Sequence, residues 1–407
     1  MAEAATPTRP RPAGIRGKLG RIVGIDVARG LALITMAATH MVATTDADTG
    51  RLTTVGWLFA GRASALFAVL AGVSLAIVTG GATPRTGVDR RRARVTIAVR
   101  AGVIGLIGLL LAMTETPVAV ILAYYAVLFL LALPFFGLGP RVLAGLAVAW
   151  ALLSPQISFW LRGMLPDPPR GQVDLVMLLT DPATAVQGLL FTGYYPAFTW
   201  MTYLLAGLAI GRLDLRSATV ASRLAAAGAA IAAAAWGVSA LLLTLLDSRI
   251  EYEGRGGPIS LVHWELNHIE WYGTTPDNSA DWLLVAGAHS GTTFDLLHTT
   301  GSAMAVIGLC LLLVRADILR RLTYPVAATG AMTLTLYSIH VLVLSFDIGD
   351  LGSRTYYLTH VVVALSIAPI WLSFFTKGPF EAVVHEIATG IGRAVVPREP
   401  EKPVEAA

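Results

Sequence analysis

Three ionisable residues fall within the first long apolar stretch of the chain, where charged groups are rare. The stretch reads RIVGIDVARGLALITMAATH and contains Asp26, Arg29 and His40. Ionisable groups at membrane depth are costly, so they normally face other protein or a wet cavity and mark functional sites. Asp26 and Arg29 are three residues apart, so they share one helix face and can pair.

The spacing of Arg29 and His40 also places them on one helix face. Eleven steps of about 100° return nearly to the same direction, with a rise of ~16 Å. A fixed guanidinium can hold a phosphate, an amide or a thioester oxygen by directed hydrogen bonds. A histidine can accept a proton from a hydroxyl or an amine, or can itself become acylated. One helix face would therefore present a fixed cation and a titratable ring, with Asp26 able to pair with Arg29 and with Gly30 permitting close approach of a helix or ligand.

Each of these residues also has a purely structural interpretation. Arg29 and Asp26 could form only a structural pair, and His40 could only end its helix and bind water. His340 could join His40 in a relay, bind an acceptor or make an interhelical hydrogen bond, and His298 has the same alternatives. Arg62 could hold an anion or extend to the lipid headgroups.

The composition indicates which elements position these residues. Hydrophobic residues make up 55% of the 407 and charged residues 14%, whereas soluble domains carry about 25% charged residues. A spanning helix needs about 20 mainly apolar residues. Ten segments qualify, near 22–43, 54–79, 95–113, 117–136, 142–161, 196–212, 220–246, 295–314, 324–346 and 356–376. The expected fold is all-α, a polytopic transmembrane helix bundle of about ten spans.

The basic residues predict the orientation of this bundle. With the N-terminus inside, 21 of the 30 Lys and Arg residues fall in cytoplasmic stretches. This bias follows the positive-inside rule and places both termini in the cytoplasm, with the protein in the plasma membrane. The run RRRAR at 90–94 is a topology determinant that could also contact anionic lipid or coenzyme A phosphates. The net charge of +4 therefore does not indicate nucleic-acid binding.

The second long outer loop contains the run HWELNHIEW. His263 and His268 are five residues apart, which does not place both on one helix face. We therefore expect no metal site. The tryptophans suit interfacial anchoring or sugar binding. The single cysteine, Cys310, lies in an apolar run and excludes an internal disulfide.

Several stretches resemble a class of transmembrane acyltransferases. Arg29, ten residues and then His40 match the Arg/His signature of the acyltransferase-3 family, and IDVARGLALITM resembles the opening of YeiB-type proteins. It also resembles the catalytic domain of heparan-alpha-glucosaminide N-acetyltransferase. Residues 121–134, 330–340 and 377–390 are similar to later YeiB segments; they read ILAYYAVLFLLALP, GAMTLTLYSIH and KGPFEAVVHEIATG.

The resemblance includes two departures. YeiB-type proteins and the glucosaminide enzyme usually have Asn where this chain has His40. The catalytic histidine of the glucosaminide enzyme lies just beyond its first helix, and here no histidine follows His40 before His263. That residue therefore has no counterpart in this chain.

The composition, together with the resemblance, predicts three segments. Residues 1–20 would be a disordered cytoplasmic tail, with a cleaved signal peptide as the competing interpretation. Residues 21–378 would form the transmembrane acyltransferase-like domain, with outer loops at about 162–195 and 247–294. Residues 379–407 would form a cytoplasmic C-terminal tail.

The expected function is transfer of an acyl group, acetyl in the first instance, from cytoplasmic acyl-CoA to a sugar, glycolipid or amine of the cell envelope. Arg29, Gly30 and Arg62 would hold the donor. His40, with Arg29, Asp26 and His340, would perform catalysis without a metal. Membrane lipid, acyl-CoA and the envelope acceptor are the expected partners. The alternatives are a transporter or flippase for an anionic metabolite or lipid, and a non-catalytic assembly or signalling protein.

Overall fold

The computed structural model describes most of the chain. The described residues are 21–48, 50–169, 171–246, 249–254, 257–346 and 354–397. The predicted tail 1–20 lies outside them. The helices of the first half are α1 (Val23–Met41), α2 (Thr54–Phe59), α3 (Arg62–Val78), α4 (Gly87–Ala112), α5 (Leu122–Ala132), η1 (Leu133–Gly137), α6 (Pro140–Arg162), α7 (Leu175–Thr180), α8 (Pro182–Gln187), η2 (Gly188–Thr192) and α9 (Ala197–Gly211).

The second half adds further helices and one short hairpin. Its elements are α10 (Ala218–Leu245), β1 (Arg249–Gly254), β2 (Gly257–Val262), η3 (His263–His268), η4 (Ala280–Leu284), α11 (Thr293–Leu313), α12 (Asp317–Leu322), α13 (Tyr324–Ala331), α14 (Thr333–Ser345), α15 (Arg354–Phe374) and α16 (Pro379–Val395). The strands β1 and β2 pair antiparallel within the second outer loop.

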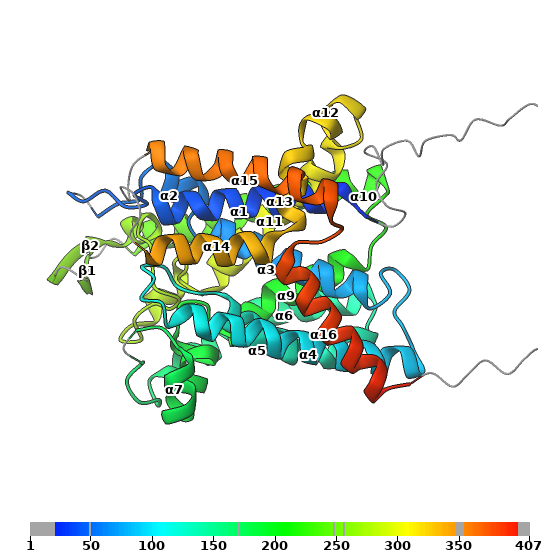
Figure 1. Cartoon of the computed structure of the whole chain (residues 1–407). Coiled ribbons are helices and arrows are strands. Elements are labelled where there is room, and N and C mark those ends of the chain that lie inside the picture. Colours follow the sequence, from blue (N-terminus) through cyan, green and yellow to red (C-terminus); the bar gives the residue numbers. More distant parts are fainter. Residues whose placement is uncertain are drawn as a thin grey trace, which may run out of the picture.

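The described helices form a multi-pass membrane bundle (Figure 1). Six are long and apolar enough to cross a membrane: α2 with α3, α4, α6, α10, α11 and α15. α13 and α14 would make a seventh if they form one span bent by 82°. α5 with η1, and α9, are apolar but shorter. Each of the ten predicted segments contains one of these helices or α1, so the all-α bundle is confirmed, whereas ten spans stay a prediction.

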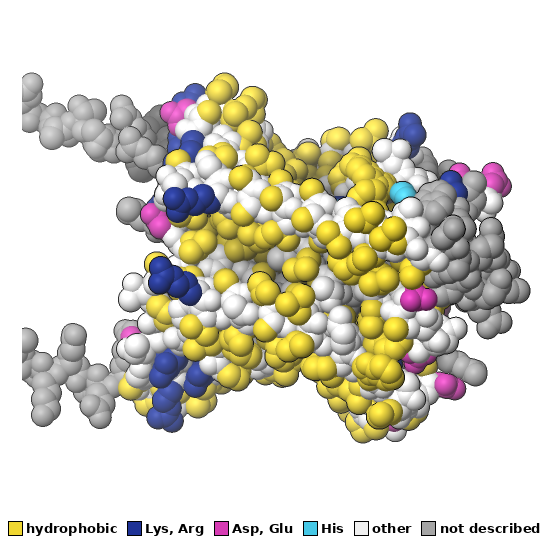
Figure 2. Space-filling model, turned by 180° about the vertical axis from the view of Figure 1, so that it is seen from behind, with side chains coloured by type: hydrophobic (Ala, Val, Ile, Leu, Met, Phe, Trp, Pro, Cys, Tyr) yellow, Lys and Arg dark blue, Asp and Glu magenta, His cyan; other side chains and the backbone are white. Residues whose placement is uncertain are grey.

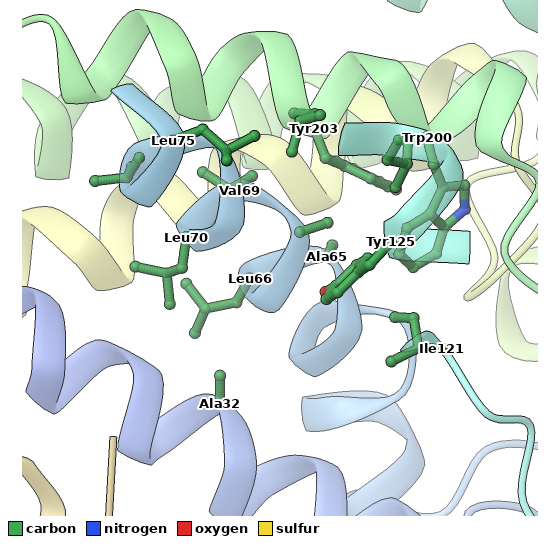
Figure 3. Close-up of a cluster of buried hydrophobic side chains, with 14 of the residues drawn as sticks. Ala32, Ala65, Leu66, Val69, Leu70, Leu75, Ile121, Tyr125, Trp200 and Tyr203 are labelled. Atoms are coloured by element: carbon green, nitrogen blue, oxygen red, sulfur yellow. The ribbon is translucent and has the colours of Figure 1, made fainter. Parts of the chain in front are cut away.

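The core lies where α1, α3 and α9 pack together. α3 and α9 approach closely because Gly72 and Gly207 face the opposing helix; a Cβ on Gly207 would collide with the carbonyl oxygen of Val69. Small residues at such contacts are typical of membrane helix packing. Figure 3 shows the adjoining buried cluster, in which Val69 of α3 lies near Tyr203 of α9. α10 and α15 instead bury only a small share of their residues inside the protein, as expected of helices that face lipid.

Charge is distributed unevenly along the bundle. The start of α1 and the end of α16 lie at the same end (Figure 1). On the face seen in Figure 2, Lys and Arg side chains gather at that end, and hydrophobic side chains cover the middle. This arrangement agrees with termini on one side of the membrane. The cytoplasmic assignment of that side stays a prediction.

Two segments differ from the simplest sequence interpretation. The run at 90–94 is not a loop but lies in α4, which begins at Gly87, and Arg92 donates to the carbonyl of Val396 at 2.6 and 2.8 Å. The segment after 378 begins with α16, which packs against α4 and α14. The domain boundary at 378 stays a prediction, but α16 lies against the bundle.

Candidate functional site

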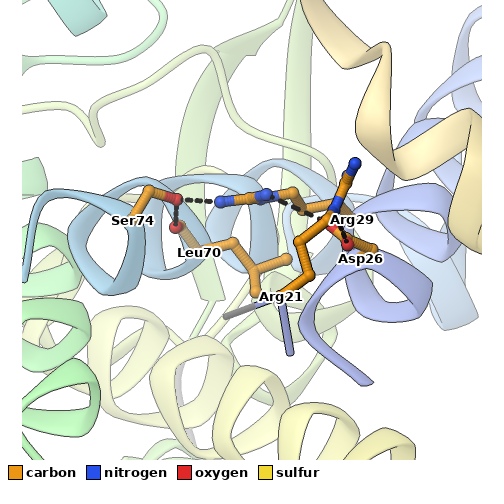
Figure 4. A network of polar contacts seen from close by, with 5 residues as sticks. All are labelled: Arg21, Asp26, Arg29, Leu70 and Ser74. Atoms are coloured by element: carbon orange, nitrogen blue, oxygen red, sulfur yellow. Dashed lines mark hydrogen bonds and ion pairs between the residues drawn. The ribbon is translucent and has the colours of Figure 1, made fainter. Parts of the chain in front are cut away.

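Asp26 forms the centre of a polar network on the first helix. Arg29 donates to Asp26 through Nη1 at 3.2 Å, and the Nε of Arg21 donates to the same carboxylate at 2.9 Å. The Nη2 of Arg29 donates to the hydroxyl of Ser74 on α3, and Ser74 donates in turn to the carbonyl of Leu70 (Figure 4). The i, i+3 pair expected from the sequence is therefore present. The bond to Ser74 directs Arg29 inwards, towards α3.

Arg29 lines an internal pocket of about 460 Å³. Its walls come from α1, α3, α4, α5, α13, α14 and α16. The polar and charged lining residues are Arg21, Asp26, Arg29, Ser74, Thr96, Arg100, Thr333, Glu381, His385 and Thr389. Apolar and aromatic residues line the rest, including Met36, Phe67, Leu70, Ile104, Ile121, Leu122, Tyr125, Phe129 and Tyr337. The pocket is suited to an elongated ligand with an anionic part and a less polar part.

Arg100 of α4 brings a second guanidinium to the polar part of the pocket. It is close enough to Arg29 and Glu381 to interact electrostatically with both. Its Nε is buried and has no hydrogen-bond partner among the described residues. Buried polar atoms are normally hydrogen-bonded, so an unpaired donor beside a pocket is a position for a ligand acceptor. Arg100 also lies within an apolar segment of the sequence, so the rule that selected Arg29 applies equally to it.

Glu381 of α16 stabilises the broken helix that forms one wall. The chain turns by 82° between α13 and α14. This break leaves the first N–H groups of α14 without helical partners. One carboxylate oxygen of Glu381 accepts from the N–H groups of Leu334 at 2.7 Å and Thr335 at 3.2 Å, and the other accepts from the Thr335 hydroxyl at 2.6 Å. Glu381 therefore acts as an N-cap supplied from a distant helix.

Gly30 of α1 and Gly330 of α13 let these two helices approach each other closely. A Cβ on Gly30 would collide with the carbonyl oxygen of Val326, and a Cβ on Gly330 with that of Asp26. Gly330 lines the pocket, whereas Gly30 does not. The close approach expected at Gly30 is thus made by helix α13. The role of Gly30 in donor binding stays a prediction.

His40 and His340 are in direct contact. The Nδ1 of His40 lies 2.9 Å from the Nε2 of His340, and the rings stack with centroids 5.2 Å apart. The Nδ1 of His340 lies 3.1 Å from the Nε2 of His360 on α15. His340 is almost fully buried. The three imidazoles form a continuous hydrogen-bonded chain, and His360 is a member that the sequence analysis did not select.

The pocket ends one helical turn before these histidines. Met36 and Tyr337 line its inner end, which is the end nearer to the histidines. His40 follows Met36 by four residues on α1, and His340 follows Tyr337 by three residues on α14, so each histidine lies on the same helix face, ~5–6 Å further along the axis. Neither His40 nor His340 lines the pocket itself. The expected groove from Arg29 to His40 is therefore present as far as Met36.

Two other predicted residues lie away from the pocket. Arg62 begins α3 at the end opposite to Ser74, where its Nη1 donates to the Ala60 carbonyl at 3.5 Å and its guanidinium carbon lies 5.8 Å from the Trp57 ring centroid. His298 contacts the carbonyl of Ala232 through Nδ1 at 2.9 Å, an interhelical hydrogen bond. Neither lines the pocket. The predicted donor contact of Arg62 stays untested.

The loop between α10 and α11 packs against these two helices through η3 and η4. Trp271 and Trp282 are buried in a small core with ring centroids 5.4 Å apart, so they do not act as exposed interfacial anchors. Glu270 accepts from the hydroxyls of Thr44 at 2.7 Å and Tyr194 at 3.1 Å. The side chain of His263 lies outside the described part of the chain. Among the described residues, no group of three or more His, Cys, Asp or Glu is placed to hold a metal ion.

His289 also lies in this loop and is buried against aromatic side chains. Its Nε2 accepts from the Gly61 N–H at 3.2 Å, and its ring centroid lies 4.4 Å from that of Tyr194. Burial lowers the pKa of His289 to about 3. The ring is therefore neutral at physiological pH. It is close enough to His40 for the two to interact electrostatically.

Comparison with known families accounts for most of the chain. Residues 21–247 match the family described as heparan-alpha-glucosaminide N-acetyltransferase, catalytic. Residues 271–391 match a second family, described as a protein of unknown function (DUF418). These matches confirm the resemblance to the glucosaminide and YeiB-type groups. A search of curated proteins finds no match. Because the first match covers more than half of the sequence, the chain belongs to the heparan-alpha-glucosaminide N-acetyltransferase catalytic family, a family of transmembrane N-acetyltransferases.

Proposed function

We propose that this protein transfers an acetyl or other acyl group from cytoplasmic acyl-CoA to an amine or hydroxyl of a cell-envelope sugar or glycolipid. The observation that carries the proposal is the pocket, which is flanked by Arg29 and Arg100 and ends one turn before a chain of three histidines. The family uses acetyl-CoA as co-substrate, and its description names an amino sugar as the acceptor.

Arg29 and Arg100 would hold the anionic part of the donor. Two guanidiniums in one buried site repel each other, and a phosphate between them removes that repulsion and accepts directed hydrogen bonds. Asp26 and Glu381 supply the compensating negative charge in the empty pocket. The apolar walls would then enclose the pantetheine arm. This arrangement directs the thioester towards Met36 and Tyr337.

The histidine chain would remove the acceptor's proton. If the Nε2 of His40 is to accept a proton, its Nδ1 must carry one and donate it to the Nε2 of His340. The Nδ1 of His340 then donates to the Nε2 of His360, so both hydrogen bonds point in the same direction, from His40 towards His360. As the acceptor attacks the thioester carbon, its proton passes to His40 and the carbon–sulfur bond breaks. While His40 holds this proton, its positive charge is spread along the chain. The departing thiolate then takes the proton from His40, which returns the histidine to its neutral form. Acylation of His40 itself is the other route that this position allows.

The same arrangement supports a proposal for the membrane in which the protein lies and for the side from which the acceptor binds. The donor pocket begins at the end of the bundle where the basic residues gather, which is the expected cytoplasmic side. His40 lies at the opposite end of α1. We therefore place the protein in the plasma membrane, with the acceptor reaching the histidines from the outer side.

The test follows thiol release by purified protein in nanodiscs, supplied with acetyl-CoA and glucosamine. We expect acceptor-dependent release, and a loss of about 100-fold or more in His40→Ala, the range that removal of a general base produces. His298→Ala is the matched control, because that histidine is hydrogen-bonded elsewhere. Equal rates in wild type and His40→Ala would remove His40 from the mechanism.

A transporter for an anionic metabolite is the second candidate. The bent pair α13–α14 favours it, because many transporters build their binding sites from discontinuous helices. The basic pocket would bind the anion in this case also. Uptake of radiolabelled acetyl-CoA into proteoliposomes, without thiol release, would support transport over transfer.

A further inference from the structure

The side chains of Tyr125 and Tyr337 line the pocket, and the hydrogen-bonding capacity of neither hydroxyl is fully used in the fold. Tyr125 of α5 lines the pocket, is 7% exposed, and its hydroxyl has no hydrogen-bond partner among the described residues. Figure 3 shows its ring extending from α5 towards α3. Buried hydroxyls normally have a partner. Because Tyr125 lines the pocket, a ligand bound there could supply the missing hydrogen-bond partner of its hydroxyl.

Tyr337 of α14 is the second member of the pair. It is 3% exposed and lines the same pocket. Its hydroxyl oxygen accepts from the Ile121 backbone N–H at 3.2 Å. This bond fixes the position of the oxygen and leaves the hydroxyl proton free to be donated. The hydroxyls of Tyr125 and Tyr337 are close enough to interact electrostatically.

We infer that the hydroxyls of Tyr125 and Tyr337 bind the acyl carbonyl oxygen of the donor. The ligand that fits is a group with acceptor lone pairs and no proton of its own, because both hydroxyls have a proton to donate. A thioester carbonyl at the inner end of the pocket meets this requirement. Its carbon would lie within about one helical turn of His40 and His340. This inference rests on the proposed function.

The pair would act on the transition state of the transfer. When the acceptor attacks the carbonyl carbon, the electron pair of the C=O bond moves to the oxygen, and two fixed donors stabilise the resulting negative charge. The electron pair moves back from the oxygen and re-forms the C=O bond when the carbon–sulfur bond breaks and the thiolate leaves. Both tyrosines keep their protons throughout. Their role is therefore hydrogen-bond donation, separate from the proton transfer assigned to His40.

The test compares acetyl-CoA with coenzyme A, which has the same phosphates and pantetheine but no acyl carbonyl. Equilibrium binding to the full-length protein in nanodiscs is measured for wild type, Tyr125→Phe and Tyr124→Phe. Tyr124 precedes Tyr125 on the same helix but does not line the pocket. We expect Tyr125→Phe to weaken acetyl-CoA binding about three- to tenfold, the net effect of one hydrogen bond. Its coenzyme A binding should match wild type, and Tyr124→Phe should bind both ligands as wild type does.

Infrared spectroscopy gives a second measurement on the bound donor. Hydrogen bonds lower the stretching frequency of a carbonyl, so acetyl-CoA labelled with 13C at the carbonyl should absorb at lower frequency in the wild-type complex than in water-free solvent. Tyr125→Phe should raise it again. The wild-type measurement remains available even if a variant does not fold.

The possible outcomes separate the inference from the proposed function. Selective loss of acetyl-CoA affinity in Tyr125→Phe supports the carbonyl site. Unchanged binding, or equal losses for acetyl-CoA and coenzyme A, would overturn it while leaving the donor pocket in place. Wild-type protein that binds neither ligand would overturn the proposed function, and the inference with it.

Discussion

Replacement of Glu381 by alanine tests whether the cap from α16 holds the broken helix in place. The change removes three hydrogen bonds to the start of α14, at 2.6, 2.7 and 3.2 Å. Loss of a helix N-cap costs about 1–2 kcal/mol. The third bond, from a hydroxyl to a carboxylate, adds about 1 kcal/mol. Because Glu381 is only partly buried, water replaces some of these bonds, and we expect a total loss of about 2 kcal/mol.

The assay is thermal unfolding in detergent, followed together with acetyl-CoA binding. Because the entropy of unfolding grows with chain length, a loss of about 2 kcal/mol lowers the melting temperature by roughly 2–3 °C in a chain of this size. Glu381→Gln keeps one acceptor oxygen and should recover part of the loss. Glu386→Ala is the matched control, an exposed glutamate on the same helix. Because α14 carries Tyr337 into the pocket, acetyl-CoA affinity should fall in Glu381→Ala. A melting temperature and affinity equal to wild type would refute the capping role.

Two further predictions concern pH and helix packing. Unfolded histidine titrates near pH 6.5, whereas burial lowers the pKa of His289 to about 3. Between these values the unfolded state holds the extra proton, so stability should fall as the pH drops below 6.5, by at most ~1.4 kcal/mol per pH unit from this group. Melting curves of His289→Gln should show a weaker acid dependence than wild type, and parallel curves would contradict the assignment. Gly330→Ala should destabilise the protein because its Cβ would collide with the Asp26 carbonyl, whereas Gly390→Ala has open space; equal melting temperatures for the two variants would contradict the close packing.

Local patterns made much of the fold and part of the site predictable. Apolar runs of about 20 residues were enough to locate the helices, because lipid requires backbone hydrogen bonds to be satisfied within a segment. The pairing of Asp26 with Arg29 depends only on helix geometry and could be read from their spacing. The contact of His40 with His340 depends on α14 lying beside α1. It fits both a relay and an interhelical hydrogen bond, and the relay stays a prediction.

Other parts of the site depend on contacts between distant segments and could not be derived from spacing. Glu381 caps α14 only because α16 folds back beside a helix break, and no proline marks that break at Met332. Arg100 and His360 could have been selected, like Arg29, as ionisable residues within apolar segments. The residues that they contact, however, depend on how α4 and α15 pack and could not be predicted. The end of the pocket at Met36 follows from side-chain packing that the sequence pattern does not encode.

The most direct test of the central claim is a cryo-electron microscopy structure of the His40→Ala variant with acetyl-CoA bound, since this variant should retain the donor without turning it over. We expect the donor phosphates beside Arg29 and Arg100, and the thioester between Met36 and Tyr337, with its carbonyl oxygen on the Tyr125 hydroxyl. Acetyl-CoA bound outside the pocket, or inside it with the thioester at the arginine end, would contradict the account.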